Sequence, residues 1–401
     1  MKMSGRTTAF LATSAGMLMI LALAGCNAQS GSPDESASAA TGKPIRVGAI
    51  ASLTGPAVFP EASAAAKAYF DYLNKHGGVG GHPIEYKVVD DGGDPAKAAQ
   101  AAKTLVEDDG VVVLGGEGSL LQCAVNADYL AKQGIVDVPG TGVDPGCFAS
   151  AAISPVNTGP YVGVTVSLYY LSEKRGIDHV CYVQQSVPAF NPAFKAAVER
   201  WSALTGKSLA APIQFVDPTD DLTPVVSSLK SSGCRAVFFS LNEAPLVALM
   251  QAVTTQGLGS DMVLMSQTSG FTEGVATALG AAGQGLLANS EFLPFNSDSS
   301  ELDQWRKIMT DAGVPLTSFA EGGYLAAKII ADTLSGIKGD ITRESVAKAF
   351  HALTSFPTPL MGTDYAFGDG DTHASNRASM IVELKDGKWK TVKDEWVRLP
   401  N

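Results

Sequence analysis

The chain has 401 residues, of which 17% are charged and 45% are hydrophobic, and its formal net charge at pH 7 is -11. This composition is typical of a globular protein of one to three domains with enough apolar residues to fill a core. The acidic balance argues against a nucleic-acid-binding protein, which needs a basic face, and against a polybasic membrane patch.

The N-terminus has the pattern of a cleaved export signal. A positively charged start precedes an apolar stretch that is too short and too weakly flanked for a transmembrane helix. It ends in a Leu-Ala-Gly-Cys motif at Cys26, which resembles the lipobox of bacterial lipoproteins and implies cleavage after residue 25 and a lipid on the Cys26 sulfur. An ordinary signal peptide with a chance cysteine is the alternative. Residues 26–43 are rich in Ser, Ala and Gly and predict a flexible tether outside the membrane.

Strands and helices are expected to alternate along the rest of the chain, which favours an α/β fold with parallel sheets flanked by helices. The apolar patterns predict strands at 45–55, 82–91, 111–116, 135–140, 179–185, 209–216, 234–241 and 262–267. They predict helices at 61–78, 96–110, 120–134, 164–176, 192–206, 222–233, 243–257, 324–336 and 341–353. A hairpin is expected at 378–392 with Asp386-Gly387 at its turn.

Four cysteines remain after Cys26, and outside the cytoplasm they are able to form disulfides. Cys123 and Cys147 enclose a short loop between turn-rich segments, and this pairing is favoured. Cys181 and Cys234 each begin an apolar strand, so a second disulfide and buried free thiols are both open. The spacing of Cys and His suggests no metal site.

The segment Val111–Cys123, VVVLGGEGSLLQC, runs from a predicted strand through a glycine turn to Ser119 and a predicted helix. A dinucleotide-binding fingerprint fails there because Leu121 occupies the place of the third glycine. The chain has no P-loop, no Gly-x-Ser-x-Gly elbow and no His-Glu-x-x-His helix. No cofactor is expected. An enzyme such as an amidase is a remaining alternative, but the sequence offers no nucleophile–base pair for it.

Small and polar residues follow five of the predicted strands, and ligands of open parallel sheets bind beyond such strand ends. Glycine amides at a helix N-terminus suit a carboxylate, with hydroxyl donors from Ser119 and Thr141. An ordinary tight turn with Ser119 as helix N-cap is the alternative, and the two roles are compatible. The five segments are Gly116–Ser119, Gly140–Gly142, Gln184–Phe190, Leu241–Asn242 and Gln267–Thr268.

The order and spacing of several segments resemble the Leu/Ile/Val-binding family of solute-binding proteins, which serve ABC importers. The segments are IRVGAIASLTGPA, LNKHGGVGGHPIEYKVVDDGGDPAKAAQAAKTLVEDDGVVVLGGEGS, GIVDVPGTG and AVFFSLNEAPLVALMQAVTTQGLGSDM. The resemblance implies a type I periplasmic-binding fold, in which two Rossmann-like lobes are joined by three crossings and the ligand binds between them. It implies one lobe from residues 44–157 and 291–378, and a second from 158–290 and 379–401.

The resemblance also implies roles for individual residues. Gly118, Ser119 and the loop Gly140, Thr141, Gly142 would hold a ligand carboxylate, and Phe59 and Phe190 would close over the ligand. Asn242 replaces an aromatic residue of the family. The acidic partner of an α-ammonium falls near Gln267 or Thr268, which are uncharged, and a buried ammonium without a partner costs several kcal/mol.

We therefore expect a monomeric, extracytoplasmic, lipid-anchored receptor that delivers a solute to permease and ATPase subunits and performs no covalent chemistry. Small carboxylic acids or amides are expected to bind better than zwitterions such as leucine, unless Glu243 or Glu273 supplies the missing charge. A ligand sensor on the same scaffold is the main alternative.

Overall fold

The computed structural model describes residues 39–55, 57–258, 262–373 and 376–400. The signal peptide at 1–25, the lipidation motif at Cys26 and most of the expected tether lie outside these residues. Within them, the expected α/β fold class is confirmed: two sheets, each flanked by helices, are joined by three passages of the chain. None of the helices described is both long and apolar enough to cross a membrane.

The first sheet is parallel throughout and has the strand order β2-β1-β3-β5. A small parallel pair, β4 with β6, continues from its carboxyl edge. The strands are β1 (Ile45–Ala51), β2 (Ile84–Asp90), β3 (Val113–Gly115), β4 (Gly118–Ser119), β5 (Asp137–Val138) and β6 (Thr141–Gly142).

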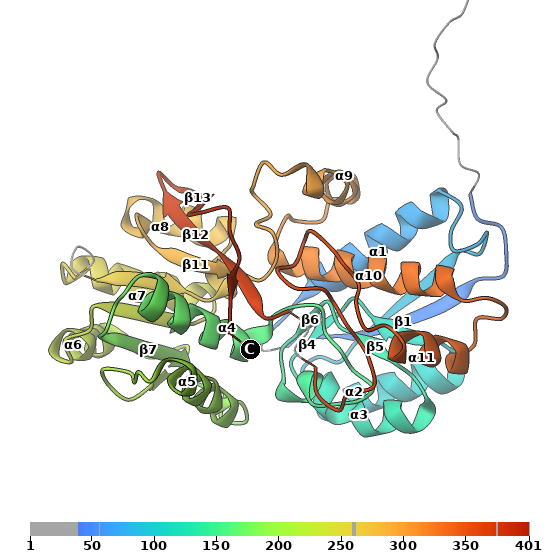
Figure 1. The fold of residues 1–401 in the computed structure, drawn as a ribbon, viewed down its shortest axis with the longest axis horizontal. Coiled ribbons are helices and arrows are strands. Elements are labelled where there is room, and N and C mark those ends of the chain that lie inside the picture. The colour runs from blue at the N-terminus through green and yellow to red at the C-terminus, as the bar shows by residue number, and fades with distance from the viewer. Residues whose placement is uncertain (1–38, 56, 259–261, 374–375, 401) are drawn as a thin grey trace, which may run out of the picture. The chain divides into compact units, whose positions relative to one another are not determined.

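Helices cover both faces of the first sheet because its strands are apolar on both sides. Val47 packs into the cluster under α1 (Pro60–Lys75) and α10 (Ser318–Gly336), whereas Ile50 packs under α2 (Pro95–Lys103) and α3 (Gln122–Gln133). Figure 1 shows α10, from late in the chain, beside α1 from its beginning, and the two helices are in extensive contact. Two further helices cover this layer: α9 (Asp303–Ala312) packs on α1 and α10, and α11 (Arg343–His351) packs on α10.

The second sheet has the order β13-β12-β11-β10-β9-β7-β8, and β14 pairs with β12. It is parallel from β8 to β11 and antiparallel from β11 to β13. Asp386 and Gly387, both at positive φ, form the expected hairpin turn between β12 and β13. The strands are β7 (Val180–Gln185), β8 (Gln214–Val216), β9 (Ala236–Ser240), β10 (Val263–Ser266), β11 (Leu287–Ser290), β12 (Ala378–Lys385), β13 (Lys388–Thr391) and β14 (Val397–Arg398).

Successive side chains of the central strand β9 point to opposite faces, as a strand requires. Phe238 packs with α4 (Gly159–Tyr169) and α5 (Asn191–Thr205), whereas Phe239 packs with α6 (Thr223–Ser231), α7 (Glu243–Thr255) and α8 (Glu273–Leu279). The short helices are 3-10 at Pro145–Phe148, Thr268–Gly270, Gly280–Gly283 and Ser300–Leu302, and π at Thr104–Asp108 and Tyr170–Lys174.

The three passages between the sheets are held together by hydrogen bonds. Asn157, on the first passage, donates from Nδ2 to Oε1 of Glu291 on the second at 3.4 Å. Asn376, on the third, donates to the Glu291 carbonyl at 2.6 Å. Thr158 donates to the carbonyl of Ala378 at 3.1 Å. These bonds join segments that are more than 80 residues apart in sequence, so the passages form one linked unit.

Both disulfides are formed. The favoured pair, Cys123 with Cys147, is bonded and ties the start of α3 to the turn after β6. Cys181 with Cys234, which the sequence left open, is bonded as well and links β7 to the segment that leads into β9. The two bonds brace different sheets.

Candidate functional site

A cavity of about 510 Å³ lies where the carboxyl ends of strands from both sheets meet the passages between them. Its walls are mainly apolar. Among the expected residues, seven line it: Phe59, Thr141, Gly142, Phe190, Asn242, Gln267 and Thr268. Phe319 of α10 also lines the cavity, and its ring meets that of Phe59 edge-on at 5.6 Å. An apolar cavity with a few convergent polar groups is typical of a small-molecule site.

Ser119 is close to the cavity in sequence but does not line it. Its side chain is 3% exposed, and its hydroxyl donates to Oδ2 of Asp91. Oγ of Ser119 accepts the backbone N–H groups of Leu121 and Gln122. The hydroxyl thus has partners within the chain, and it accepts the N–H groups of the N-cap Leu121 and of the first residue of α3, as the tight-turn alternative expects. The expected carboxylate seat stays a prediction.

Gly118 and Gly140 are also absent from the cavity lining. Both glycines lie where other parts of the chain approach closely. A Cβ on Gly118 would lie 2.8 Å from Cβ of Phe59. A Cβ on Gly140 would lie 2.7 Å from Cα of Gly323 in α10. The structure thus explains the need for glycine at both positions without a ligand.

Gly142, one of the glycines whose amides were expected to receive an anion, and two nearby amides already have partners within the chain. Thr141 N–H donates to the Glu117 carbonyl at 2.9 Å, and Gly142 N–H donates to Oδ1 of Asn157 at 2.8 Å. Ala124 N–H, in the first turn of α3, donates to Oδ2 of Asp144 at 3.3 Å. An incoming carboxylate would have to displace these bonds.

Several polar groups of the second lobe lie along the cavity wall. Ser240 donates to the amide oxygen of Gln267, and Asn242 N–H donates to Oε1 of Gln185 at 3.0 Å. The hydroxyl of Thr268, whose side chain is 6% exposed, is buried without a hydrogen-bond partner. A buried unpaired hydroxyl is costly, by about 1–3 kcal/mol, so Thr268 has spare capacity for a ligand.

Glu291 lines the cavity and was not among the residues expected from the sequence. It is 2% exposed and follows β11 at the start of the second passage. Burial raises the pKa of Glu291 to about 7, although hydrogen bonds from Asn157 and from the Gly159 amide oppose that rise. Of the described residues that line the cavity, none is Lys, Arg, His or Asp, so Glu291 is its one carboxyl and it has no cationic neighbour.

Glu243 and Glu273, the alternative sources of the missing charge, line a neighbouring cavity of about 420 Å³. The two cavities share Thr268 and Phe319. Both glutamates are exposed to solvent. Their attraction for a charged group of a buried ligand is therefore weaker than that of buried Glu291.

A group of buried acids lies beneath the first-lobe loop, outside the cavity. Gln122 donates to Oδ2 of Asp137 at 2.6 Å and to Oε1 of Glu117 at 3.3 Å. Desolvation raises the pKa of Glu117 and raises that of Asp137 to about 6. These carboxyls hydrogen-bond to Gln122 at the start of α3, and neither of them lines the cavity.

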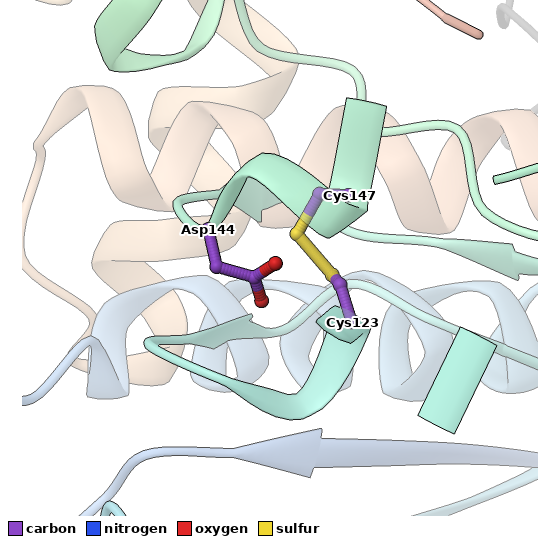
Figure 2. A group of neighbouring side chains, drawn as sticks. All are labelled: Cys123, Asp144 and Cys147. Atoms are coloured by element: carbon purple, nitrogen blue, oxygen red, sulfur yellow. A yellow bond between two sulfur atoms is a disulfide. The ribbon is translucent and has the colours of Figure 1, made fainter. Parts of the chain in front are cut away.

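Figure 2 shows Asp144 beside the disulfide of Cys123 and Cys147. Two sulfurs and a carboxylate resemble a metal-ligand set in composition. However, both sulfurs are joined in the disulfide and are not thiolates, which are the form that binds metal. The cluster is therefore structural. The Asp144 carboxylate caps the first turn of α3 and accepts the Gly146 N–H at 2.7 Å.

Two sheets joined by three passages, with a cavity where their strand ends meet, are typical of two-lobed solute-binding proteins. A family model described as "Periplasmic binding protein" matches residues 44–388, and the chain belongs to that family. Leu/Ile/Val-binding protein homolog 3 of Brucella melitensis is 27% identical over 362 residues, covering 86% of this chain and 92% of that protein. The resemblance to Leu/Ile/Val-binding proteins is thus confirmed.

Solved structures show the same fold. A branched-chain amino acid ABC transporter protein from Thermus thermophilus with bound valine has a TM-score of 0.74 at 18% identity, covering 88% of this chain and 96% of that one. A solute-binding protein from Rhodopseudomonas palustris in complex with p-hydroxybenzoic acid has a TM-score of 0.73 at 19% identity, with coverages of 90% and 98%. Proteins of this fold are therefore found with both zwitterions and aromatic acids.

Proposed function

We propose that this protein is the extracytoplasmic, lipid-anchored solute receptor of an ABC importer and that it binds one small solute in the cavity between its two lobes. The lobes would comprise residues 44–157 with 291–378 and 158–290 with 379–401. The observation that carries the proposal is the cavity itself, which draws its walls from both sheets and from the linked passages.

The cavity chemistry favours some of the expected solutes over others. Apolar walls suit an aliphatic or aromatic body, and the amides and hydroxyls of the second lobe suit a neutral polar head. A free carboxylate would meet no cationic side chain among the described lining residues and would lie near Glu291. Amide-bearing solutes are therefore favoured over simple aromatic acids.

The proposed role needs closure of the lobes around the solute, with contacts made in the closed state shifting the population. The closed monomer would then be recognised by the permease and ATPase subunits. The solute would leave chemically unchanged. Recovery of a solute converted by the purified protein would refute the binding role and favour an enzyme.

The direct test is calorimetry on the wild type and on two matched variants. Ala189, in the loop after β7, lines the cavity and is exposed, whereas Ala196 on α5 is exposed and does not line it. Ala189→Trp should weaken solute binding about tenfold or more by filling the cavity mouth, and Ala196→Trp should not. Equal affinities in both variants would place the binding site elsewhere.

A further inference from the structure

We infer that Glu291 is the charge-selecting residue of the cavity: it pairs with a protonated amine of the solute, which makes the ligand an amine-bearing molecule. This inference rests on the proposed binding function. It moves the acidic partner from the strand end at Gln267 and Thr268, where the family resemblance placed it, to the second passage between the lobes.

Within the part of the chain that the structure describes, the cavity has a negative group without a positive partner. Glu291 is the one carboxyl among the described lining residues, and no basic side chain faces it there. A buried carboxylate without a cation is costly, and so is a buried ammonium without an anion. A protonated amine on the solute would remove both penalties at once, whereas a carboxylate on the solute would add a second negative charge.

The groups that surround Glu291 are neutral. The groups that contact it from the adjoining segments are amides: Asn157 Nδ2 and Gly159 N–H on its carboxylate and Asn376 Nδ2 on its carbonyl. Arg377 is the other charged residue on the described passages, and it hydrogen-bonds to the Pro400 carbonyl at 3.3 Å. The titration of Glu291 is set by burial and by these amides, with no charged neighbour contributing.

The location of Glu291 gives the inference a mechanical consequence. Its side chain and its backbone carbonyl join the first and third passages to the second. An amine that pairs with the carboxylate therefore contacts the segments about which the lobes would turn. Solute charge and lobe closure would be coupled through one residue.

The charge pairing predicts a proton exchange of known sign. With a pKa of about 7, the empty protein holds Glu291 mostly protonated at pH 5.5. An ammonium favours the ionised form, so binding at that pH should release about one proton from Glu291 to solvent, and less as the pH approaches 7. A solute held instead by the protonated carboxyl would release none and would bind more weakly as the pH rises.

The test uses four probes of one shape: L-leucinamide, L-leucine, 4-methylpentanamide and 4-methylpentanoate. Calorimetry in buffers of different ionisation enthalpy measures both affinity and proton release. Leucinamide should bind about tenfold more tightly at pH 7 than at pH 5.5. Glu291→Gln should abolish proton release and weaken leucinamide about tenfold or more, while binding of 4-methylpentanamide should not change.

Glu321→Gln is the matched control, because Glu321 is a fully buried glutamate of α10 with a raised pKa that does not line the cavity. It should leave the pH dependence of binding intact. Leucinamide binding that is independent of pH, or equal in wild type and Glu291→Gln, would overturn the inference and leave the receptor function standing. If no probe binds, native mass spectrometry of a co-purified solute decides: a solute without an amine overturns the inference, and no solute at all overturns both proposals.

Discussion

Ser119 donates its hydroxyl hydrogen to Asp91, a fully buried carboxylate that also accepts from Ser52 at 2.9 Å. Glycine-turn serines of this family were expected to face the ligand. Here the chain itself supplies the carboxylate that the serine binds. Hydrogen bonds within the chain therefore hold the loop around Ser119 in place. Leu120 and Leu121, which follow it, line the cavity.

This pairing predicts the effect of Ser119→Ala. The variant removes one donor from buried Asp91 and the acceptor of the Leu121 and Gln122 amides, so the free energy of unfolding should fall by about 1–3 kcal/mol. Solute affinity should change little. Urea unfolding and calorimetry measure the two effects; a stable variant with strongly weakened solute binding would restore the expected carboxylate seat.

The buried carboxyls predict that the stability of the protein falls as the pH rises. The folded-state pKa values of Glu291, Asp137 and Asp144 are raised to about 7, 6 and 6 by burial. Their stabilising contribution is complete below the unfolded pKa of about 4 and is lost as the pH rises through the folded values. The midpoint of thermal unfolding should therefore be higher at pH 5 than at pH 8.

Glu291→Gln isolates one part of this effect. A neutral amide removes the ionisation of Glu291, which contributes on the order of 3 kcal/mol of pH-dependent stability between about pH 4 and pH 8. The variant should gain stability relative to wild type at pH 8 and change little at pH 5. An identical pH profile for the two proteins would show that Glu291 titrates normally.

The two disulfides predict separate losses of stability. Removal of the bond between Cys123 and Cys147 by double alanine substitution should cost about 3 kcal/mol, and removal of the bond between Cys181 and Cys234 about 4 kcal/mol. The second loop is longer, which accounts for the larger value. Peptide mapping without reductant checks the pairing first, and free thiols at all four positions in the native protein would exclude both bonds.

Membrane attachment is predicted to depend on Cys26. Cys26→Ser removes the sulfur that would carry the lipid, so the protein should move from the membrane fraction to the soluble fraction after cell lysis. The soluble body should bind solute as before. A variant that remains in the membrane fraction would show that another segment holds it there.

Features that depend on neighbouring residues were predicted from the sequence, whereas contacts between residues far apart in the chain were not. Strands such as β9 and helices such as α5 were predictable because alternation and helical periodicity are local patterns. Glu291 was missed because β11, which precedes it, is short and ends in polar residues, and because its partner Asn157 lies 134 residues away. The bond of Ser119 to Asp91 was not predicted for a similar reason: the two residues lie 28 positions apart. The ligand role of Ser119 stays a prediction.

The central claim is that the cavity between the two lobes binds a small solute. Native mass spectrometry of the protein after exposure to a low-molecular-weight cell extract tests it most directly. The account predicts a one-to-one adduct on the wild type and on Ala196→Trp that disappears on unfolding and is absent from Ala189→Trp. No adduct on the wild type, or an equal adduct on Ala189→Trp, would contradict the account.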